Sequence, residues 1–190
     1  MKKITQILTS AKGWTIAGTL ATIISIYPFV HSSIKQYIQE YKLECKAKKG
    51  NVYAQAELGY KYFKDGDSKN ALIWCKKAAD NGHPTAMANI ATHFYNNKDY
   101  FKALEWGKHA ANLGDPHAQY LIGMIYLYGY EVIEPDYKLA FKYLESAKEK
   151  GHIDAIILLG NCFLEGIGIE KDIQMATSLF QQASLLKDKK

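Results

Sequence analysis

The sequence predicts an all-α fold, a right-handed solenoid of four helical hairpins preceded by a single transmembrane helix. One observation is a pattern of glycine, alanine and aromatic residues that recurs four times from residue 50 to the end of the chain. A second is a stretch of 22 residues without formal charge, from Gly13 to Ile34. The composition is typical of a folded protein, since 48% of the residues are hydrophobic and 13% are aromatic.

The N-terminal region divides into a short basic segment, residues 1–12, and a predicted transmembrane anchor, residues 13–33. About 20 apolar residues in a helix span the hydrocarbon core of a bilayer. Trp14 stands at one end of the apolar stretch and Tyr27 and Phe29 stand at the other, as aromatic side chains do at membrane interfaces. We therefore expect a single-pass protein that contacts the membrane through residues 13–33.

Two other interpretations of this segment stay open. One is a cleaved signal peptide, although residues 28–33 form a poor cleavage site, and the other is a buried core helix. Lysines on the two sides of the segment nearly balance, so the positive-inside rule does not choose a topology. Because a short basic start usually stays in the cytoplasm, we expect an inner-membrane protein with periplasmic repeats. Three cysteines without a pairing pattern favour the opposite side.

Residues 34–49 are predicted to form a helical cap, since their apolar side chains recur every three or four residues. Residues 50–190 are predicted to form the repeat domain, with a glycine opening each unit. Residues at offsets 4, 8 and 12 from this glycine share one helical face, and a small residue at offset 9 allows a neighbouring helix to approach closely. The predicted units are 50–81, 82–113, 114–150 and 151–187.

The second half of each unit predicts a second helix. Alanines seven residues apart and one larger side chain between them form its packing seam. The next glycine can end this helix in a left-handed conformation, and an aspartate before the helix can cap its start. The seam alanines begin at Ala71, Ala103, Ala140 and Ala176, and the predicted caps are Asp99, Asp136 and Asp172.

These motifs resemble the Sel1-like repeat, a family closely related to tetratricopeptide repeats. The resemblance rests on Leu-Gly-x-x-Tyr in the first helix, on Ala-x-x-Trp/Tyr-x-x-x-Ala in the second, and on a loop with Gly166, Gly168 and Asp172. It covers roughly residues 47–187, although the first two units lack the long loop and Leu179 replaces an aromatic residue in the fourth. The resemblance implies a solenoid of Sel1-like or tetratricopeptide-like repeats that binds a partner protein.

By analogy with tetratricopeptide repeats, side chains at offsets 3, 6, 10, 13 and 14 of each unit line a concave groove. Aromatic side chains and an adaptable methionine suit peptide binding there. The other interpretation is that these tyrosines pack between adjacent hairpins. The predicted partner-binding residues are Tyr53, Tyr60, Phe63, Lys64, Thr92, Tyr95, Asn96, His117, Tyr120, Met124, Tyr128, Asn161 and Glu165.

No catalytic, metal or cofactor site is expected. The chain lacks a P-loop, HExxH and CxxC, and its lysines are not clustered as in nucleic-acid-binding proteins. His83 and His152 each follow a unit-closing glycine, where capping or exposure to solvent is expected. Cys75 and Cys162 fall on repeat helices, where a small apolar side chain packs well.

We therefore predict a membrane-anchored scaffold or adaptor that binds a partner protein, and not an enzyme. An alternative is an immunity protein that neutralises a toxic enzyme, as the resemblance to Sel1-like proteins of some bacterial secretion-system loci implies. A third hypothesis is hydrolysis of β-lactams, which the resemblance implies for cysteine-rich relatives. Those relatives pair cysteines between the two helices of each unit, and this sequence has no such pairs.

Overall fold

The computed structural model describes residues 16–130 and 133–188, with side chains from residue 30 onward. Contacts divide the chain into two units, with the boundary between Cys45 and Lys46. The predicted basic segment 1–12 and the start of the predicted anchor, 13–15, lie outside the described residues.

Helix α2 (Ile16–Lys48) is one continuous element of 33 residues. It includes most of the predicted anchor and nearly all of the predicted cap, and Pro28 does not end it. Good helix formers such as Lys, Glu, Gln and Leu are frequent in the second half of α2, from residue 35 onward. In the part of the chain that the structure describes, no helix is both long and apolar enough to cross a membrane.

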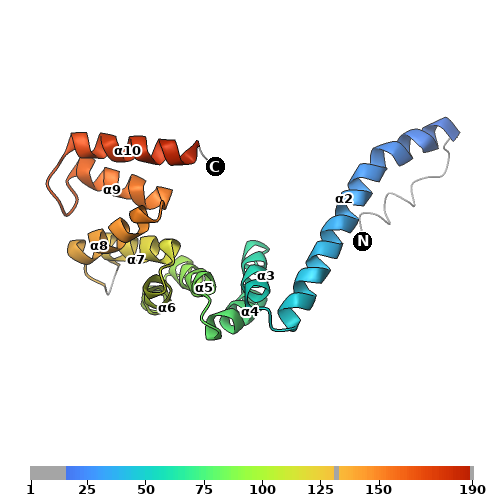
Figure 1. The fold of residues 1–190 in the computed structure, drawn as a ribbon, viewed down its shortest axis with the longest axis horizontal. Helices are drawn as coiled ribbons and strands as arrows, with labels where there is room; N and C mark the ends of the chain where they lie inside the picture. Colours follow the sequence, from blue (N-terminus) through green and yellow to red (C-terminus); the bar gives the residue numbers. More distant parts are fainter. Residues whose placement is uncertain (1–15, 131–132, 189–190) are drawn as a thin grey trace. The chain divides into compact units, whose positions relative to one another are not determined.

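The second unit is a stack of helical hairpins, which confirms the predicted all-α repeat architecture (Figure 1). Residues 16–130 and 133–188 contain no β-strand and one isolated bridge, between Tyr130 and Ile133. The hairpins are α3 (Val52–Lys64) with α4 (Ser68–Asp80), α5 (Pro84–Asn96) with α6 (Tyr100–Asn112), α7 (Pro116–Tyr128) with α8 (Tyr137–Glu149), and α9 (Ile153–Glu165) with α10 (Ile173–Lys187).

Side-chain caps explain where these helices begin. The predicted caps Asp99, Asp136 and Asp172 each accept a hydrogen bond from a backbone N–H of the following second helix. His83 and His152 cap α5 and α9, since each Nδ1 accepts from a backbone N–H at 3.3 Å. The predicted capping role of these two histidines is therefore confirmed.

Small residues let the helices pack closely. Ala86, Ala118 and Ala155 at offset 4 are fully buried, and so are Ala103 and Ala140 on the second helices. Each second helix packs against its own first helix, and α4, α6 and α8 also pack against the first helix of the next unit. Helix α5 also contacts both α3 and α7, so these three first helices lie side by side. One side of the first helices is thereby left outside the hairpin contacts.

The last turn of α2 occupies the place of a second helix before α3. Ala47 is buried, and its carbonyl oxygen accepts a hydrogen bond from Gln55 Nε2 at 3.1 Å. Two units further on, Gln119 Nε2 on α7 donates in the same way to the Ala111 carbonyl of α6, at 3.4 Å. The hydrogen bond between Ala47 and α3 is thus equivalent to the one between α6 and α7.

Candidate protein-binding face

All of the predicted partner-binding residues lie on the first helices α3, α5, α7 and α9, and we call the surface that they form the first-helix face. Phe63, Tyr95, Tyr120 and Met124 also pack against the cores between hairpins, as the alternative interpretation expected. The half-buried members are Phe63, Thr92, Tyr95, Tyr120 and Met124. The exposed members are Tyr53, Tyr60, Lys64, Asn96, His117, Tyr128, Asn161 and Glu165.

Three exposed tyrosines are the largest apolar groups of this face. The side chains of Tyr53, Tyr60 and Tyr128 are 77%, 51% and 52% exposed. Tyrosine combines a large apolar ring with a hydrogen-bonding hydroxyl, and it is enriched in the residues that contribute most to protein–protein binding. Solvated rings on a shared face are therefore available for an apolar contact.

Contacts between successive units fix the N-terminal ends of the first helices. The ring of Tyr53 packs edge-on against the cap residue His83, with 5.1 Å between ring centroids. One unit later, the Thr85 hydroxyl donates to Oδ2 of the cap residue Asp115 at 3.1 Å. In the following unit, Tyr120 stacks on the cap residue His152 at 4.8 Å. Each first helix is thus held to the next through the residue that caps it.

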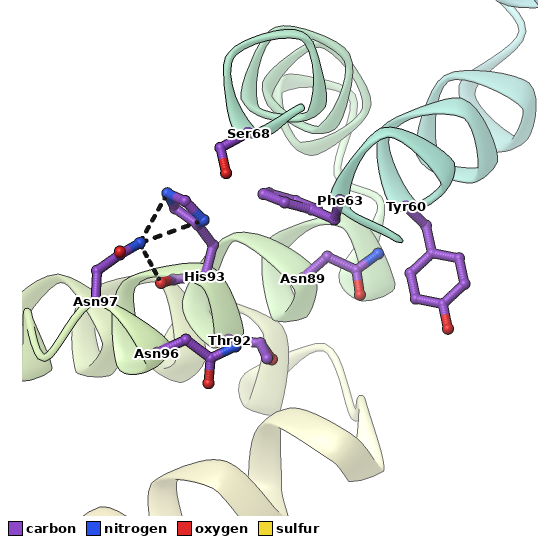
Figure 2. A pocket seen from close by; sticks show the side chains of 8 residues that line it. All are labelled: Tyr60, Phe63, Ser68, Asn89, Thr92, His93, Asn96 and Asn97. Atoms are coloured by element: carbon purple, nitrogen blue, oxygen red, sulfur yellow. Dashed lines mark hydrogen bonds between the residues drawn. The ribbon is translucent and has the colours of Figure 1, made fainter. Parts of the chain in front are cut away.

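A pocket of about 310 Å³ lies between α3 and α5 (Figure 2). One wall is the Phe63 ring, which stacks on the His93 ring with 5.1 Å between centroids. Asn97 Nδ2 holds His93 from the other side through the His93 carbonyl oxygen at 2.9 Å and the ring nitrogen Nε2 at 3.2 Å. The residues lining the pocket are Tyr60, Phe63, Ser68, Asn89, Thr92, His93, Asn96 and Asn97.

Two asparagine amides in this pocket are open to a ligand. Asn89 and Asn96 lie seven residues apart on α5, on the same face. Among the described residues, neither side-chain amide makes a hydrogen bond. A side-chain amide offers both donors and an acceptor, as a peptide main chain does. The pocket can therefore pair with the backbone of a bound segment.

A second feature is the tyrosine cluster, which consists of Tyr95, Tyr100, Tyr120, Tyr128 and Tyr130. The hydroxyls of Tyr95 and Tyr130 form a hydrogen bond of 2.8 Å. Tyr100 stacks on Tyr130 with 4.0 Å between centroids, and it packs edge-on against Tyr95. These contacts hold the start of the α7–α8 loop against α5 and α6.

Burial raises the pKa of three phenols in this cluster. For Tyr120 the second cause is the Asp154 carboxylate. For Tyr128 the causes after burial are the Cys162 thiol and the Glu165 carboxylate. For Tyr130 the second cause is its hydrogen bond with Tyr95. All of these effects disfavour the phenolate, so the cluster presents neutral hydroxyls beside acidic groups.

The two cysteines of the repeat helices are buried and free. Burial raises the pKa of the Cys75 thiol to about 12 and that of the Cys162 thiol to about 11. A thiol with so high a pKa is a weak nucleophile at neutral pH. Within residues 16–130 and 133–188, no three His, Cys, Asp or Glu side chains gather as metal ligands would.

Comparison with known proteins places these features in a family of repeats. The Sel1 repeat matches four times, at residues 52–83, 84–115, 116–152 and 153–188. These limits lie about two residues beyond the predicted ones, because the repeat is counted from the first helix and not from the glycine before it. A search of curated proteins found no match.

Three crystal structures of bacterial proteins share the fold. A protective antigen present in uropathogenic Escherichia coli strains, described as displaying an SLR fold, has 29% identity over 76% of this chain and 32% of its own, with a TM-score of 0.67. A Sel1 repeat protein from Oxalobacter formigenes has 26% identity over 72% of this chain and 59% of its own, with a TM-score of 0.64. A sel1 repeat protein from Klebsiella pneumoniae subsp. pneumoniae has 23% identity over 77% of this chain and 74% of its own, with a TM-score of 0.66. The chain thus spans less than two thirds of the first two proteins.

Proposed function

Since the chain belongs to the Sel1 repeat family, we propose that it is a membrane-anchored scaffold whose first-helix face binds a partner protein. Sel1 repeat proteins generally mediate protein–protein interactions. The observation that supports this face is the exposure of large aromatic side chains on it, Tyr53, Tyr60 and Tyr128. Aromatic groups grouped on one surface are typical of an interaction site and not of a surface adapted only to water.

The chemistry of the face suits an extended segment of the partner. The exposed rings offer apolar area, and the free amides of Asn89 and Asn96 offer hydrogen bonds to a peptide backbone. Two helical turns separate these amides, a span of about 10.5 Å, which equals about three residues of an extended chain. A strand-like segment along α5 could therefore bond to both amides at once.

The test of this proposal compares two faces of the same solenoid. The double variant Tyr53→Ala/Tyr60→Ala removes exposed rings from α3. The control Ile73→Ala/Phe101→Ala removes exposed apolar groups from the second helices α4 and α6. A partner is first identified by co-purification with the full chain, and its affinity for each variant is then measured by titration calorimetry.

We expect the first double variant to weaken binding by about ten-fold or more, because tyrosine is enriched among the few interface residues whose truncation costs over about 1 kcal/mol. The control should bind as the parent chain does. If the control loses as much affinity as the first variant, the first-helix face is not the binding surface.

The membrane part of the proposal rests on the sequence. The uncharged stretch from Gly13 to Ile34 has the length of a span, and basic residues precede it. We place the repeats on the periplasmic side of the inner membrane. C-terminal fusions to alkaline phosphatase and to green fluorescent protein test this topology, since the first is active outside the cytoplasm and the second fluoresces inside. Release of the chain from membranes by alkaline carbonate would contradict the anchor.

A further inference from the structure

A second pocket, of about 380 Å³, lies between α3 and α5. It adjoins the pocket of Figure 2, because Tyr60 and Asn89 line both. Among the described residues that line it, Glu57 is the only one with a full charge at neutral pH, so we call it the acidic pocket. Its α3 wall consists of Tyr53, Glu57 and Tyr60, and its α5 wall consists of His83, Thr85 and Asn89.

The α3 wall places a carboxylate between two aromatic rings. Tyr53, Glu57 and Tyr60 are four and three residues apart, so they share one helical face. All three residues are exposed. The Tyr53 ring is restrained by its edge-to-face contact with His83, with 5.1 Å between centroids. A group that enters the pocket therefore meets an aromatic ring and a carboxylate together.

The negative charge of Glu57 is not compensated locally. Within residues 16–130 and 133–188, its carboxylate forms no ion pair and no hydrogen bond. Lys61 and Lys64 are the lysines of α3, and neither lines the pocket. Helix α5 contains no Lys, Asp or Glu. The pocket is thus acidic, although the chain has a formal net charge of +5.

The aromatic rings of this chain readily take a cation. Lys64 Nζ lies 5.8 Å from the centroid of the Tyr60 ring, and Lys77 Nζ lies 4.4 Å from that of Trp74. Among the described residues, no lysine lies over the Tyr53 ring, which is 77% exposed. The Tyr53 ring is therefore open to a cation from another molecule.

We propose that the acidic pocket binds an arginine side chain of the partner protein, with the guanidinium against the Glu57 carboxylate and over the Tyr53 ring. The inference rests on the proposed function, since it names a side chain of the segment that this face binds. The quadrupole of a tyrosine ring attracts a cation within about 6 Å of its centroid. Arginine suits the pocket better than lysine, because its planar guanidinium can stack on the ring and donate two hydrogen bonds to one carboxylate.

The position of the pocket agrees with the extended segment proposed along α5. Asn89 lines both pockets, so a segment bonded to the amides of Asn89 and Asn96 passes the acidic pocket. Successive side chains of an extended chain point to opposite sides. A residue of the segment close to Asn89 can therefore place its side chain in the pocket while its neighbours point away.

The probe is N-acetyl-arginine amide, which carries a guanidinium and no other charge. It is titrated into the full chain labelled with carbon-13 in its tyrosine rings, and the ring signals are followed by NMR. Tyr53→Phe and Tyr60→Phe assign the two signals. The control ligand is N-acetyl-citrulline amide, which keeps the shape and removes the charge.

We expect the arginine probe to shift the signals of Tyr53 and Tyr60, with an affinity about ten-fold above that of the citrulline ligand. Equal affinities, no shift, or shifts confined to tyrosines outside the pocket would overturn the proposal.

Variants locate the site. Glu57→Gln should reduce the affinity of the arginine probe to nearly that of the citrulline ligand, and Tyr53→Leu, followed through the Tyr60 signal, should reduce it too. The matched control is Glu105→Gln on the second helix α6. Exposed Glu105 follows exposed Phe101 by four residues, as Glu57 follows Tyr53. An equal loss in Glu57→Gln and Glu105→Gln would show unspecific attraction and refute the site.

The partner protein separates this inference from the proposed function. If Tyr53→Ala/Tyr60→Ala weakens its binding and Glu57→Gln does not, the face binds a partner and the arginine site is wrong. If neither variant weakens binding, both the face and the arginine site are wrong.

Discussion

A Cβ atom on Gly59 would lie 2.4 Å from Cys75 Sγ and 2.9 Å from the Cys75 backbone nitrogen. Helices α3 and α4 are therefore in backbone contact at offset 9 of the first unit. The same position is occupied by Ala91, Gly123 and Gly160 in the later units. A small residue here sets the distance between the two helices of a hairpin.

The change Gly59→Ala should destabilise the fold by about 1–3 kcal/mol, because α4 must move to accept the methyl group. This cost exceeds the gain of about 1 kcal/mol in helix propensity. Urea unfolding of the full chain, followed by circular dichroism, measures the free energy of unfolding. The comparison is Gly160→Ala, whose added Cβ would have ring atoms of the half-buried Phe180 side chain, and not backbone atoms, as its nearest neighbours. A Gly59→Ala chain as stable as the parent would disprove the close packing.

Thiol reactivity should distinguish the cysteines. The raised pKa values of Cys75 and Cys162 predict that neither thiol reacts readily in the folded protein near neutral pH. Cys45 on α2 is only half-buried and free, so it should react first. A chromogenic disulfide reagent should detect one fast thiol in the native chain and all three after unfolding in urea. Persistence of the fast phase in Cys45→Ser would contradict this assignment.

The tyrosine cluster predicts a loss of stability in alkaline solution. The pKa values of Tyr120, Tyr128 and Tyr130 are raised in the folded chain, so the folded state keeps protons that the unfolded chain releases near pH 10. Their contribution to stability is complete below that pH and declines as the pH rises above it. The free energy of unfolding should thus fall between neutral pH and about pH 11. Tyr130→Phe should make this fall smaller, and an unchanged slope in that variant would count against the cluster.

A buried helix cap should contribute more to the free energy of unfolding than an exposed one. Asp115 is 7% exposed, and it accepts hydrogen bonds from Ala118 N at 2.9 Å and from the Thr85 hydroxyl at 3.1 Å. Asp115→Ala should cost about 2 kcal/mol, since it leaves two donors without partners. Asp172→Ala removes a single bond from an exposed cap and should cost about 1 kcal/mol. Chemical denaturation that finds equal losses would contradict the role of Thr85.

The repeat architecture could be predicted because its signals are local. Offsets of 4, 8 and 12 from a glycine define one helical face, and the buried alanines Ala86, Ala118 and Ala155 confirm it. A cap residue such as Asp99 bonds to a backbone N–H three residues further along the chain. The sequence around it is therefore sufficient to predict the start of the helix. The same locality explains why the two capping histidines were predicted correctly.

Contacts between units were not predictable in this way. Tyr100 and Tyr130 lie outside the offsets considered for the groove, and Tyr95 and Tyr130 are 35 residues apart. Their meeting depends on how the α7–α8 loop packs on the preceding hairpin, which no periodicity encodes. Asn89 and His93 were missed for a similar reason, although the spacing of Asn89 and Asn96 on α5 was a usable signal.

Site-specific photo-crosslinking tests most directly whether the first-helix face binds a partner protein. A photoreactive phenylalanine derivative replaces Tyr60 or Tyr128 on the first helices, and Ile73 or Phe101 on the second helices, in the full chain expressed in its own cells. All four positions are exposed in the solenoid. We predict a discrete crosslinked protein, the same one, from positions 60 and 128 and none from positions 73 and 101. Crosslinks of equal yield from both sets, or only from the second helices, would contradict the account.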